Sequence, residues 1–461
     1  SDQLMKILIL GVGKVGGTLA EHLAGEAFDV TVVDLDEQRL QELRDRLDIR
    51  TVYGHASRPD VLQRADADDA DMLIAVTGSD EVNMVACQVS YSLFKTPMKI
   101  ARIRASAYLT GSDFFTQDHM PIDVLINPEE VVTDQIRQLL QHPGALQVLD
   151  FADGRVQLAA MRAYPDGKLV GQRIIALRDH IPNVETRVAA IFRQGQPITP
   201  RWDTIVEAED EVFFVAAAEN ISAVMEEFRH VEKPFKRVMI AGGGNIGESL
   251  ARSIEPSFSV KVLEHSEGRA DAAAQRLNSS VVILGDATDR DLLIQENIER
   301  TDAFCAVTND DEVNIMSSML AKQLGVRQVM TLIGKPAYVD LMHEGSIDIA
   351  ISPQLATTST ILTHVRRADV ARVHSLRRGA AEAMEAIVHG DERSSKVVGR
   401  RLVDLALPEG TTIGALVRDD RVLIAHDELE IKSEDHVILF LTDKSRIASV
   451  ERLFQVNFNF F

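Results

Sequence analysis

One stretch decides the fold of this chain: KILILGVGKVG at residues 6–16. An apolar run of strand type stops at a glycine, and a helical pattern follows at once. The other half of the chain repeats this arrangement as RVMIAGGGNIG at residues 237–247. In both places a short buried strand leads through G-x-G-x-x-G into an amphipathic helix, which is the order of a nucleotide-binding βαβ unit.

Each glycine of the motif has its own physical role. The first, Gly11, lets the chain turn sharply off the strand, and the second, Gly13, lets the backbone approach a pyrophosphate. The third, Gly16, lets the helix pack on the strand, and the helix N-terminus then offers unpaired amides to phosphate groups. The candidate phosphate-binding residues are therefore Gly11, Val12, Gly13, Lys14 and Val15 in the first copy, and Gly242, Gly243, Gly244, Asn245 and Ile246 in the second.

An acidic residue ends the next expected strand in each copy, about 20 residues beyond the loop. Asp34 closes the run 29–34 and Glu264 closes the run 259–264. A carboxylate here accepts hydrogen bonds from ribose hydroxyls and repels a 2′-phosphate, so we expect NAD(H) or adenine nucleotides rather than NADP(H). Leu35, next to Asp34, joins the candidate site.

Composition excludes several classes of function. The chain has 461 residues, enough for two to four domains, and a formal net charge of −21. Such an acidic balance argues against nucleic acid as a direct partner and against binding by charge to an anionic bilayer. The sequence contains no apolar run of about 18 residues, so we expect no membrane insertion, and we expect no leader before Met5. Cys87 and Cys305 read as buried thiols of a reducing compartment rather than as a disulfide.

Strand and helix patterns alternate through residues 5–104, which predicts a parallel sheet with helices on both faces. Ligands of such sheets bind outside the carboxyl ends of the strands. This rule brings His55 and Ala56, Thr77 and Gly78, and Arg102 around the same crevice as the glycine loop. Arg102 could offer positive charge to a phosphate, or it could form a surface or interface salt bridge.

The remainder of the chain is a small β-rich domain followed by a second copy of the whole design. We predict an α/β protein with two Rossmann-like doubly wound parallel sheets, each followed by a small β-rich α+β domain. The expected order is a first Rossmann-like domain (5–127), a connecting helix (128–143), a small C domain (144–230), a second Rossmann-like domain (236–352), a connecting helix (353–368) and a second small C domain (369–455).

The second copy departs from the first in its charged residues. Thr308 matches Thr77, but our alignment sets Ile333 at the position of Arg102 and Lys335 at that of Arg104. We therefore expect the second site to bind weakly, to bind a different nucleotide, or to be structural.

Four motifs of the first copy resemble one family: ILGVGKVGGT (9–18), VTVVD (30–34), DEVNM (80–84) and IARIR (100–104). The chain resembles TrkA, the family of peripheral NAD-binding subunits of the bacterial Trk potassium-uptake system, which are built from two RCK domains (regulators of K⁺ conductance). The resemblance extends over residues 5–461. It implies tandem RCK domains that bind NAD(H), with ATP or ADP as competing ligands.

The resemblance also implies a role and partners. Such a protein is a homodimer or homotetramer on the cytoplasmic face of the plasma membrane, and it gates a Trk-type potassium channel subunit without catalysis. The first site would consist of the loop, Asp34, Thr77, Gly78 and Arg102. The second would contain its own loop, Glu264 and Thr308.

Two other functions stay open: an NAD-dependent dehydrogenase and a redox-sensing nucleotide-binding protein. A dehydrogenase needs a substrate domain and a proton-transfer group facing the nicotinamide. The domain after the first sheet is short and shows no catalytic pair, and His55, His142 and His374 are scattered. No metal-ligand spacing occurs, so we predict neither catalytic residues nor a metal site. The aromatic tail at residues 458–461 could dock on a partner or cover a local apolar patch.

Overall fold

The computed structural model describes residues 4–26, 28–110, 113–230, 233–335, 337–338, 347–366, 369–377 and 380–456. The aromatic tail at 458–461 lies outside these residues. The chain forms two compact units: unit 1 comprises Ser1–Val131 with Ser352–Ile361, and unit 2 comprises Val132–Ile351 with Leu362–Phe461.

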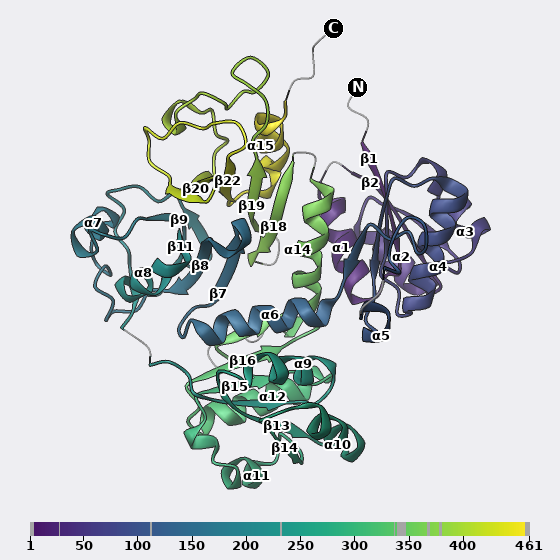
Figure 1. The fold of residues 1–461 in the computed structure, drawn as a ribbon, viewed down its shortest axis with the longest axis horizontal. Helices are drawn as coiled ribbons and strands as arrows, with labels where there is room; N and C mark the ends of the chain where they lie inside the picture. The colour runs from purple at the N-terminus through teal and green to yellow at the C-terminus, as the bar shows by residue number, and fades with distance from the viewer. Residues whose placement is uncertain are drawn as a thin grey trace. The chain divides into compact units, whose positions relative to one another are not determined.

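Unit 1 contains a parallel sheet of six strands in the order β3-β2-β1-β4-β5-β6. Figure 1 shows it in purple and blue, flanked by its helices. Its strands are β1 (Met5–Leu10), β2 (Phe28–Asp34), β3 (Arg50–Tyr53), β4 (Met72–Ala75), β5 (Met98–Arg102) and β6 (Val124–Ile126). Its helices include α1 (Lys14–Ala24), α2 (Glu37–Arg46), α3 (Pro59–Arg64), α4 (Asp80–Val89) and α5 (Ser106–Leu109).

Unit 2 contains a second sheet of the same topology, in the order β14-β13-β12-β15-β16-β17. Its strands are β12 (Arg237–Ala241), β13 (Ser259–Glu264), β14 (Val281–Leu284), β15 (Ala303–Ala306), β16 (Gln328–Leu332) and β17 (Ile349–Ile351). They alternate with α9 (Asn245–Ile254), α10 (Glu267–Arg276), α11 (Arg290–Gln295) and α12 (Asp311–Gln323). The predicted pair of Rossmann-like sheets is confirmed.

The central strands explain why the sequence folds in this way. Residues 7–10 of β1 and 238–241 of β12 are all buried. A strand covered by helices on both faces must be apolar at every position rather than at alternate ones. The glycine that follows each run ends the strand at the sheet's carboxyl edge, so the loops of both copies lie at that edge.

Each Rossmann-like sheet is followed along the chain by a small β-rich domain, as predicted, and the structure shows that its strands form an antiparallel sheet of five. The first small domain, C1, has the order β10-β9-β11-β8-β7, and the second, C2, has the order β18-β19-β22-β20-β21. C1 consists of β7 (Gln147–Phe151), β8 (Val156–Arg162), β9 (Thr186–Arg193), β10 (Gln196–Ile198), β11 (Glu211–Ala217), α7 (Leu177–His180) and α8 (Ile221–Phe228). C2 consists of β18 (Val370–Leu376), β19 (Ala381–Ile387), β20 (Thr411–Arg418), β21 (Arg421–Ile424), β22 (His436–Leu441) and α15 (Ile447–Phe454).

C1 and C2 share one hydrophobic core, which the sequence did not predict. Phe213 of C1 lies against Phe440 of C2 with ring centroids 5.1 Å apart. The Glu385 carboxylate of C2 accepts a hydrogen bond of 2.9 Å from the Ala152 amide of C1. The helices α6 (Pro128–Gln141) and α14 (Pro353–Val365) follow the last strand of each Rossmann-like sheet. In the described part of the chain, no helix has both the length and the apolar surface that crossing a bilayer requires.

Candidate nucleotide-binding site

The first glycine loop has a backbone that only glycine fits at two of its three motif positions. Gly11 has a φ of +97°, and a Cβ there would come within 2.9 Å of the Thr77 Cα. A Cβ on Gly16 would lie 1.8 Å from the carbonyl oxygen of Gly11, because the helix packs directly on the loop. Gly13 differs, since no heavy atom lies within 4 Å of its Cβ position. The open side of the loop is therefore the place where a ligand can approach the backbone.

Helix α1 begins at this open position without a capping side chain. Its N-cap is Gly13, which makes no side-chain hydrogen bond, and its first turn contains no acidic residue. The first amides of a helix have no partner within the helix, and they carry the positive end of its dipole. Lys14 at the first helical position is exposed. Loop, helix end and lysine together suit a phosphate group.

Asp34 braces the loop from the end of β2. Its Oδ2 accepts a hydrogen bond of 2.7 Å from the Val12 amide, and its Oδ1 accepts one of 2.8 Å from the Asp36 amide. An ionised carboxylate has about four acceptor positions, so capacity remains for ribose hydroxyls. Leu35 beside it is 56% exposed and could cover an adenosine only from the solvent side.

The loop after β3 lies next to Asp34. The Gly54 amide donates to the Asp34 carbonyl oxygen over 3.0 Å, so the next two residues, His55 and Ala56, follow at the same edge of the sheet. The Nδ1 of His55 lies 3.0 Å from the Ser57 hydroxyl oxygen. The side chain of Ala56 belongs to the core, like that of Val15, so these two residues can face a ligand only through their backbone.

Thr77 and Gly78 are joined to β5 by a buried amide that sequence reasoning did not single out. Asn83 accepts hydrogen bonds from the Thr77 amide (3.0 Å) and hydroxyl (2.7 Å), and its Nδ2 donates to the Arg102 carbonyl oxygen (2.9 Å). Asn314 repeats these contacts with Thr308 and Leu332. The sequence offered a signal for this asparagine, because both copies contain DEVN at the start of the helix.

The Nε of the Arg102 guanidinium is buried, and it has no hydrogen-bond partner among the described residues. Burial lowers the pKa of its guanidinium, Arg104 lowers it further, and Glu129 and Asp80 raise it. An arginine nonetheless stays protonated in proteins, so its unmet donor favours an anionic ligand. The residues present at this crevice therefore fit a nucleotide phosphate.

Arg104 belongs to the same region but was missed as a site residue. Its guanidinium donates a hydrogen bond of 2.6 Å to the Gly78 carbonyl oxygen, and its amide donates to Asp80. The alternating pair Arg102 and Arg104 at the end of β5 was the sequence signal.

The second glycine loop has the same backbone. Gly242 has a φ of +112°, a Cβ on Gly247 would lie 1.7 Å from the Gly242 carbonyl oxygen, and Gly244 faces open space. Asn245 and Ile246 then open α9. The loop brings the same set of backbone groups to the carboxyl edge of its sheet.

Glu264 takes the place of Asp34 but reaches further. Its Oε2 accepts a hydrogen bond from the Gly243 amide (2.7 Å), and its Oε1 accepts from the Ser266 amide (2.9 Å) and from Arg269 (3.2 Å). A Cβ on Gly243 would approach the Glu264 Cβ to 3.0 Å, so glycine there makes room for the longer acid. Burial raises the pKa of Glu264, but the amide hydrogen bonds and Arg269 outweigh it and lower the pKa overall.

The alignment of the second copy needs a correction of one residue. The Asn314 side-chain amide donates to the Leu332 carbonyl, as that of Asn83 does to Arg102, so Leu332 and not Ile333 occupies the position of Arg102. The Gly334 amide donates to Asp311, as the Arg104 amide does to Asp80, so Gly334 and not Lys335 matches Arg104. The slip arose because the second copy is one residue shorter between the asparagine and the strand end: Arg102 lies 19 residues after Asn83, whereas Leu332 lies 18 after Asn314.

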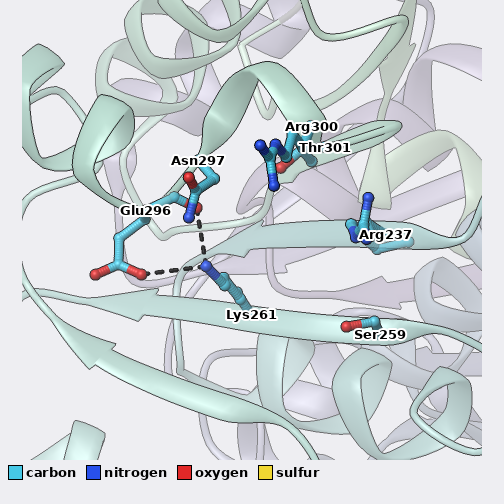
Figure 2. Close-up of a pocket in the computed structure, with 8 residues that line it drawn as sticks. Arg237, Ser259, Lys261, Glu296, Asn297, Arg300 and Thr301 are labelled. Carbon is cyan, nitrogen blue, oxygen red and sulfur yellow. Dashed lines mark hydrogen bonds and ion pairs between the residues drawn. The ribbon is translucent and has the colours of Figure 1, made fainter.

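A separate hollow of about 230 Å³ lies at the opposite edge of the second sheet (Figure 2). Arg237 and Ser259, which line it, are the first residues of β12 and β13, whereas the glycine loop follows the last residue of β12. Lys261 is held there by the carbonyl oxygen (2.8 Å) and carboxylate (3.2 Å) of Glu296. This hollow therefore lies away from the glycine loop, at the other edge of the sheet. Among the described residues, no three His, Cys, Asp or Glu side chains gather as metal ligands would.

Comparison with known proteins adds the family context. The family described as "TrkA-N domain" matches residues 7–128 and 238–353, and the "TrkA-C domain" family matches 158–229 and 392–455. "Trk system potassium uptake protein TrkA" of Halomonas elongata is 62% identical over 457 residues, covering 99% of this chain and 100% of that protein. The protein of the same description from Vibrio alginolyticus is 57% identical over 452 residues, covering 98% and 99%. The structure "GsuK channel bound to NAD" has a TM-score of 0.58 and 19% identity, covering 98% of this chain and 79% of that one, and this likeness concerns the fold alone.

Proposed function

The chain belongs to the TrkA family, and on this basis we propose that it is a non-catalytic regulatory subunit of a Trk-type potassium-uptake system. It binds NAD(H), ATP or ADP in its glycine-loop crevices. It acts as a homodimer or homotetramer on the cytoplasmic side of the plasma membrane, where nucleotide-dependent conformational change gates a potassium channel subunit.

One observation carries the nucleotide part of the proposal: a buried arginine nitrogen without a partner stands at the same sheet edge as an uncapped, open glycine loop. Arg102 and the α1 N-terminus are complementary to negative charge, and Asp34 retains acceptor capacity for hydroxyl groups. A phosphorylated ribose offers both kinds of group. The relatives described as TrkA support the potassium part.

The coupling proceeds through the end of β5. Arg102 is paired with Ile126 across β5 and β6, and α6 starts two residues later at Pro128. Asn83 ties the Thr77 loop to the same strand end. A phosphate that engages Arg102 therefore acts on the segment from which the connecting helix starts.

The size of the expected effect follows from differential binding. A ligand shifts a conformational equilibrium only by the difference between its affinities for the two states. Allosteric coupling of about 1–3 kcal/mol would change channel activity roughly 5- to 150-fold. NAD(H) and ATP have the same adenosine half. If they favour different conformational states, the difference must therefore arise from contacts with the parts of each nucleotide beyond the adenosine.

The experiment measures nucleotide binding and its consequences on the purified chain. Asp34→Ala is expected to weaken NADH and ATP binding at the first crevice in calorimetric titration, whereas Asp29→Ala, at the other end of β2, serves as the charge-matched control. Light scattering with and without NADH, ATP or ADP should show a nucleotide-dependent assembly. Potassium flux through co-reconstituted channel subunit should then follow the nucleotide.

Two outcomes would contradict the proposal. Equal affinities for wild type and Asp34→Ala would remove the assigned site. A steady fall in NADH absorbance in the presence of candidate substrates would show that the protein consumes its cofactor, and it would instead favour an NAD-dependent dehydrogenase.

A further inference from the structure

The hollow at the amino edge of the second sheet (Figure 2) is lined by three cationic side chains and one acidic side chain. Lys261 has its counter-charge there, because its Nζ lies 3.2 Å from the Glu296 carboxylate. Arg237 and Arg300 are both exposed, and neither guanidinium forms a hydrogen bond or an ion pair with another residue that the structure describes. Two positive charges without a counter-charge therefore line one small space.

The carboxylate next to these arginines along the chain is already engaged. Asp302 accepts hydrogen bonds from the backbone amides of Lys236 (2.7 Å) and Arg237 (2.9 Å), and its Oδ1 lies 3.5 Å from the Arg327 guanidinium. This carboxylate fixes the start of β12 and does not pair with either arginine side chain of the hollow. Like charges in one hollow repel each other, and an anion bound there would remove this repulsion.

The amino edge of the first sheet has the same backbone, so the two copies can be compared residue by residue. The Asp71 amide donates to the Lys6 carbonyl oxygen over 2.9 Å, and the Asp302 amide donates to that of Arg237 over 2.9 Å. Lys6 and Arg237 are therefore equivalent. A short 3₁₀ helix ends two residues before each aspartate, and the residue that precedes each of these helices has a left-handed backbone.

The charges at these equivalent positions differ between the copies. In the first copy the Lys6 ammonium forms an ion pair with Asp69, the last residue of the 3₁₀ helix. Arg300 is the last residue of the corresponding helix in the second copy, so two arginines stand where the first copy has an ion pair. This replacement brings no stability to the fold, whereas it suits an anionic ligand.

We propose that this hollow binds a phosphate monoester group, at a site separate from the glycine-loop crevices. Such a group carries a charge of about −1.5 to −2 at pH 7, which matches the two arginines. Guanidinium groups bind phosphate oxygens in a bidentate manner, and Ser259, Asn297 and Thr301 bring hydroxyl and amide donors to the same lining. The volume of about 230 Å³ suits one compact head group, because pockets that bury whole drug-sized ligands measure about 300–1,000 Å³.

Inorganic phosphate is the probe for the group itself. It is titrated into the full chain with NADH and ADP at saturating concentrations, so that the glycine-loop crevices are occupied, and binding is followed by phosphorus nuclear magnetic resonance. Arg300→Asp copies the first copy and gives Arg237 a counter-charge, so phosphate affinity should fall roughly 10- to 100-fold. Arg290→Asp changes the net charge equally at an exposed residue outside the hollow, and it should leave phosphate affinity unchanged.

Two further measurements keep the result interpretable. Arg300→Asp should unfold at the wild-type temperature or above it, because an aspartate at the equivalent position of the first copy forms an ion pair. Its NADH affinity should equal that of wild type, because the glycine loop lies at the other edge of the sheet. Arg237→Gln removes the other cation and should also weaken phosphate binding.

A sedimentation assay distinguishes the two sources of such a group, a soluble phosphate ester and a lipid head group. The vesicles contain phosphatidylcholine alone or phosphatidylcholine and phosphatidic acid in equal parts. Sedimentation with phosphatidic acid that Arg300→Asp abolishes would assign the lipid source. Phosphate binding that Arg300→Asp weakens, without sedimentation of wild type, would assign the soluble source.

Three outcomes would overturn the proposal. The first is a wild type that binds neither inorganic phosphate nor the phosphatidic acid vesicles. The second is equal binding by wild type and Arg300→Asp. The third is an equal loss in Arg290→Asp and Arg300→Asp, which would reduce the effect to net charge. None of them would affect the proposed function, because nucleotide binding at the glycine loops is measured separately.

Discussion

At the scale of single residues, each crevice depends on a carboxylate that holds its own glycine loop. Asp34 and Glu264 do this with side chains of different length, and the difference is absorbed by one change in the loop, from Val12 to Gly243. The longer acid needs glycine at this position, because a Cβ on Gly243 would already lie 3.0 Å from the Glu264 Cβ and a valine side chain would extend further.

The glycines of one motif should respond very differently to the same substitution. Gly16→Ala sets a methyl against the Gly11 carbonyl oxygen, and backbone atoms must move to relieve it, so the free energy of unfolding should fall by about 3 kcal/mol or more. Gly13→Ala meets no atom and should change stability by less than about 1 kcal/mol.

Thermal unfolding monitored by circular dichroism compares the two variants. Nucleotide titration of Gly13→Ala then reports whether the added methyl weakens binding while the fold is intact. Equal unfolding temperatures for Gly13→Ala and Gly16→Ala would contradict the packing described for the loop.

Most residues of the candidate first site could be proposed from the sequence because their types are unusual at strand ends. Glycines, Asp34 and Arg102 stand out against apolar runs, and the rule of carboxyl ends brings them together. Asn83 and Arg104 were quoted but not assigned, because hydrogen bonds to backbone carbonyls leave no trace in composition. The equivalence of Leu332 and Arg102 required the hydrogen bonds of Asn314 and Asn83.

At the scale of elements, buried ion pairs fix the ends of strands in both small domains. The Nε and a terminal nitrogen of Arg193 donate hydrogen bonds of 2.8 and 2.9 Å to the two carboxylate oxygens of Asp210. Arg418 donates to Asp435 in the same way, over 2.9 and 2.8 Å. Both aspartates are almost fully buried. The sequence shows that the two aspartates occupy equivalent positions in the two repeats. It does not show that an arginine on a neighbouring strand pairs with each of them, because arginine and aspartate are too far apart along the chain for a local pattern to connect them.

A third buried pair joins the residue after α14 to C2. Arg366 and Glu382 form two parallel hydrogen bonds of 2.8 and 2.6 Å, and their side chains are 0% and 2% exposed. Glu382→Gln removes the carboxylate charge that faces this buried guanidinium, so the free energy of unfolding should fall by about 3–5 kcal/mol.

Chemical denaturation measures this change. Asp404→Asn is the matched control, because it removes the same charge from a pair with Arg401 that is about half exposed, and it should leave the unfolding midpoint unchanged. Similar shifts in both variants would mean that the Arg366–Glu382 pair does not have the energetic weight that its burial predicts.

At the scale of the whole molecule, the stability of the joint core of C1 and C2 depends on pH. His374 of C2 packs edge-on against Phe151 of C1, with centroids 5.3 Å apart, and its Nε2 lies 3.4 Å from the Asp150 carbonyl oxygen. The pKa of His374 is lowered to about 4, chiefly by burial and then by the charge of Arg372, while Asp150 opposes the shift.

The sign of the effect follows from this lowered pKa. The neutral imidazole is the form that the core accepts, so its stabilisation is complete above the unfolded pKa of about 6.5 and is lost as the pH falls toward 4. Between pH 7 and pH 5 the free energy of unfolding should drop by about 2 kcal/mol from this residue. In His374→Gln, which stays neutral, denaturation curves at the two pH values should differ by that much less; an identical pH dependence would contradict the assignment.

The duplication was readable from the sequence, whereas the union of the two small domains was not. Phe213 and Phe440 lie in continuous apolar runs, and nothing in either run shows that its partner lies in the other repeat. Periodicity indicates that a residue is buried and does not identify what buries it.

The shared core has a consequence for how the structure responds to a low concentration of the protein. Were C1 and C2 on separate polypeptides, their pairing would obey mass action and dissolve on dilution. Tethered in one chain, each meets the other at the effective concentration set by the connecting segment, whatever the copy number in the cell. Only contacts between chains then remain sensitive to abundance, and the stoichiometry of the two repeats is fixed at synthesis.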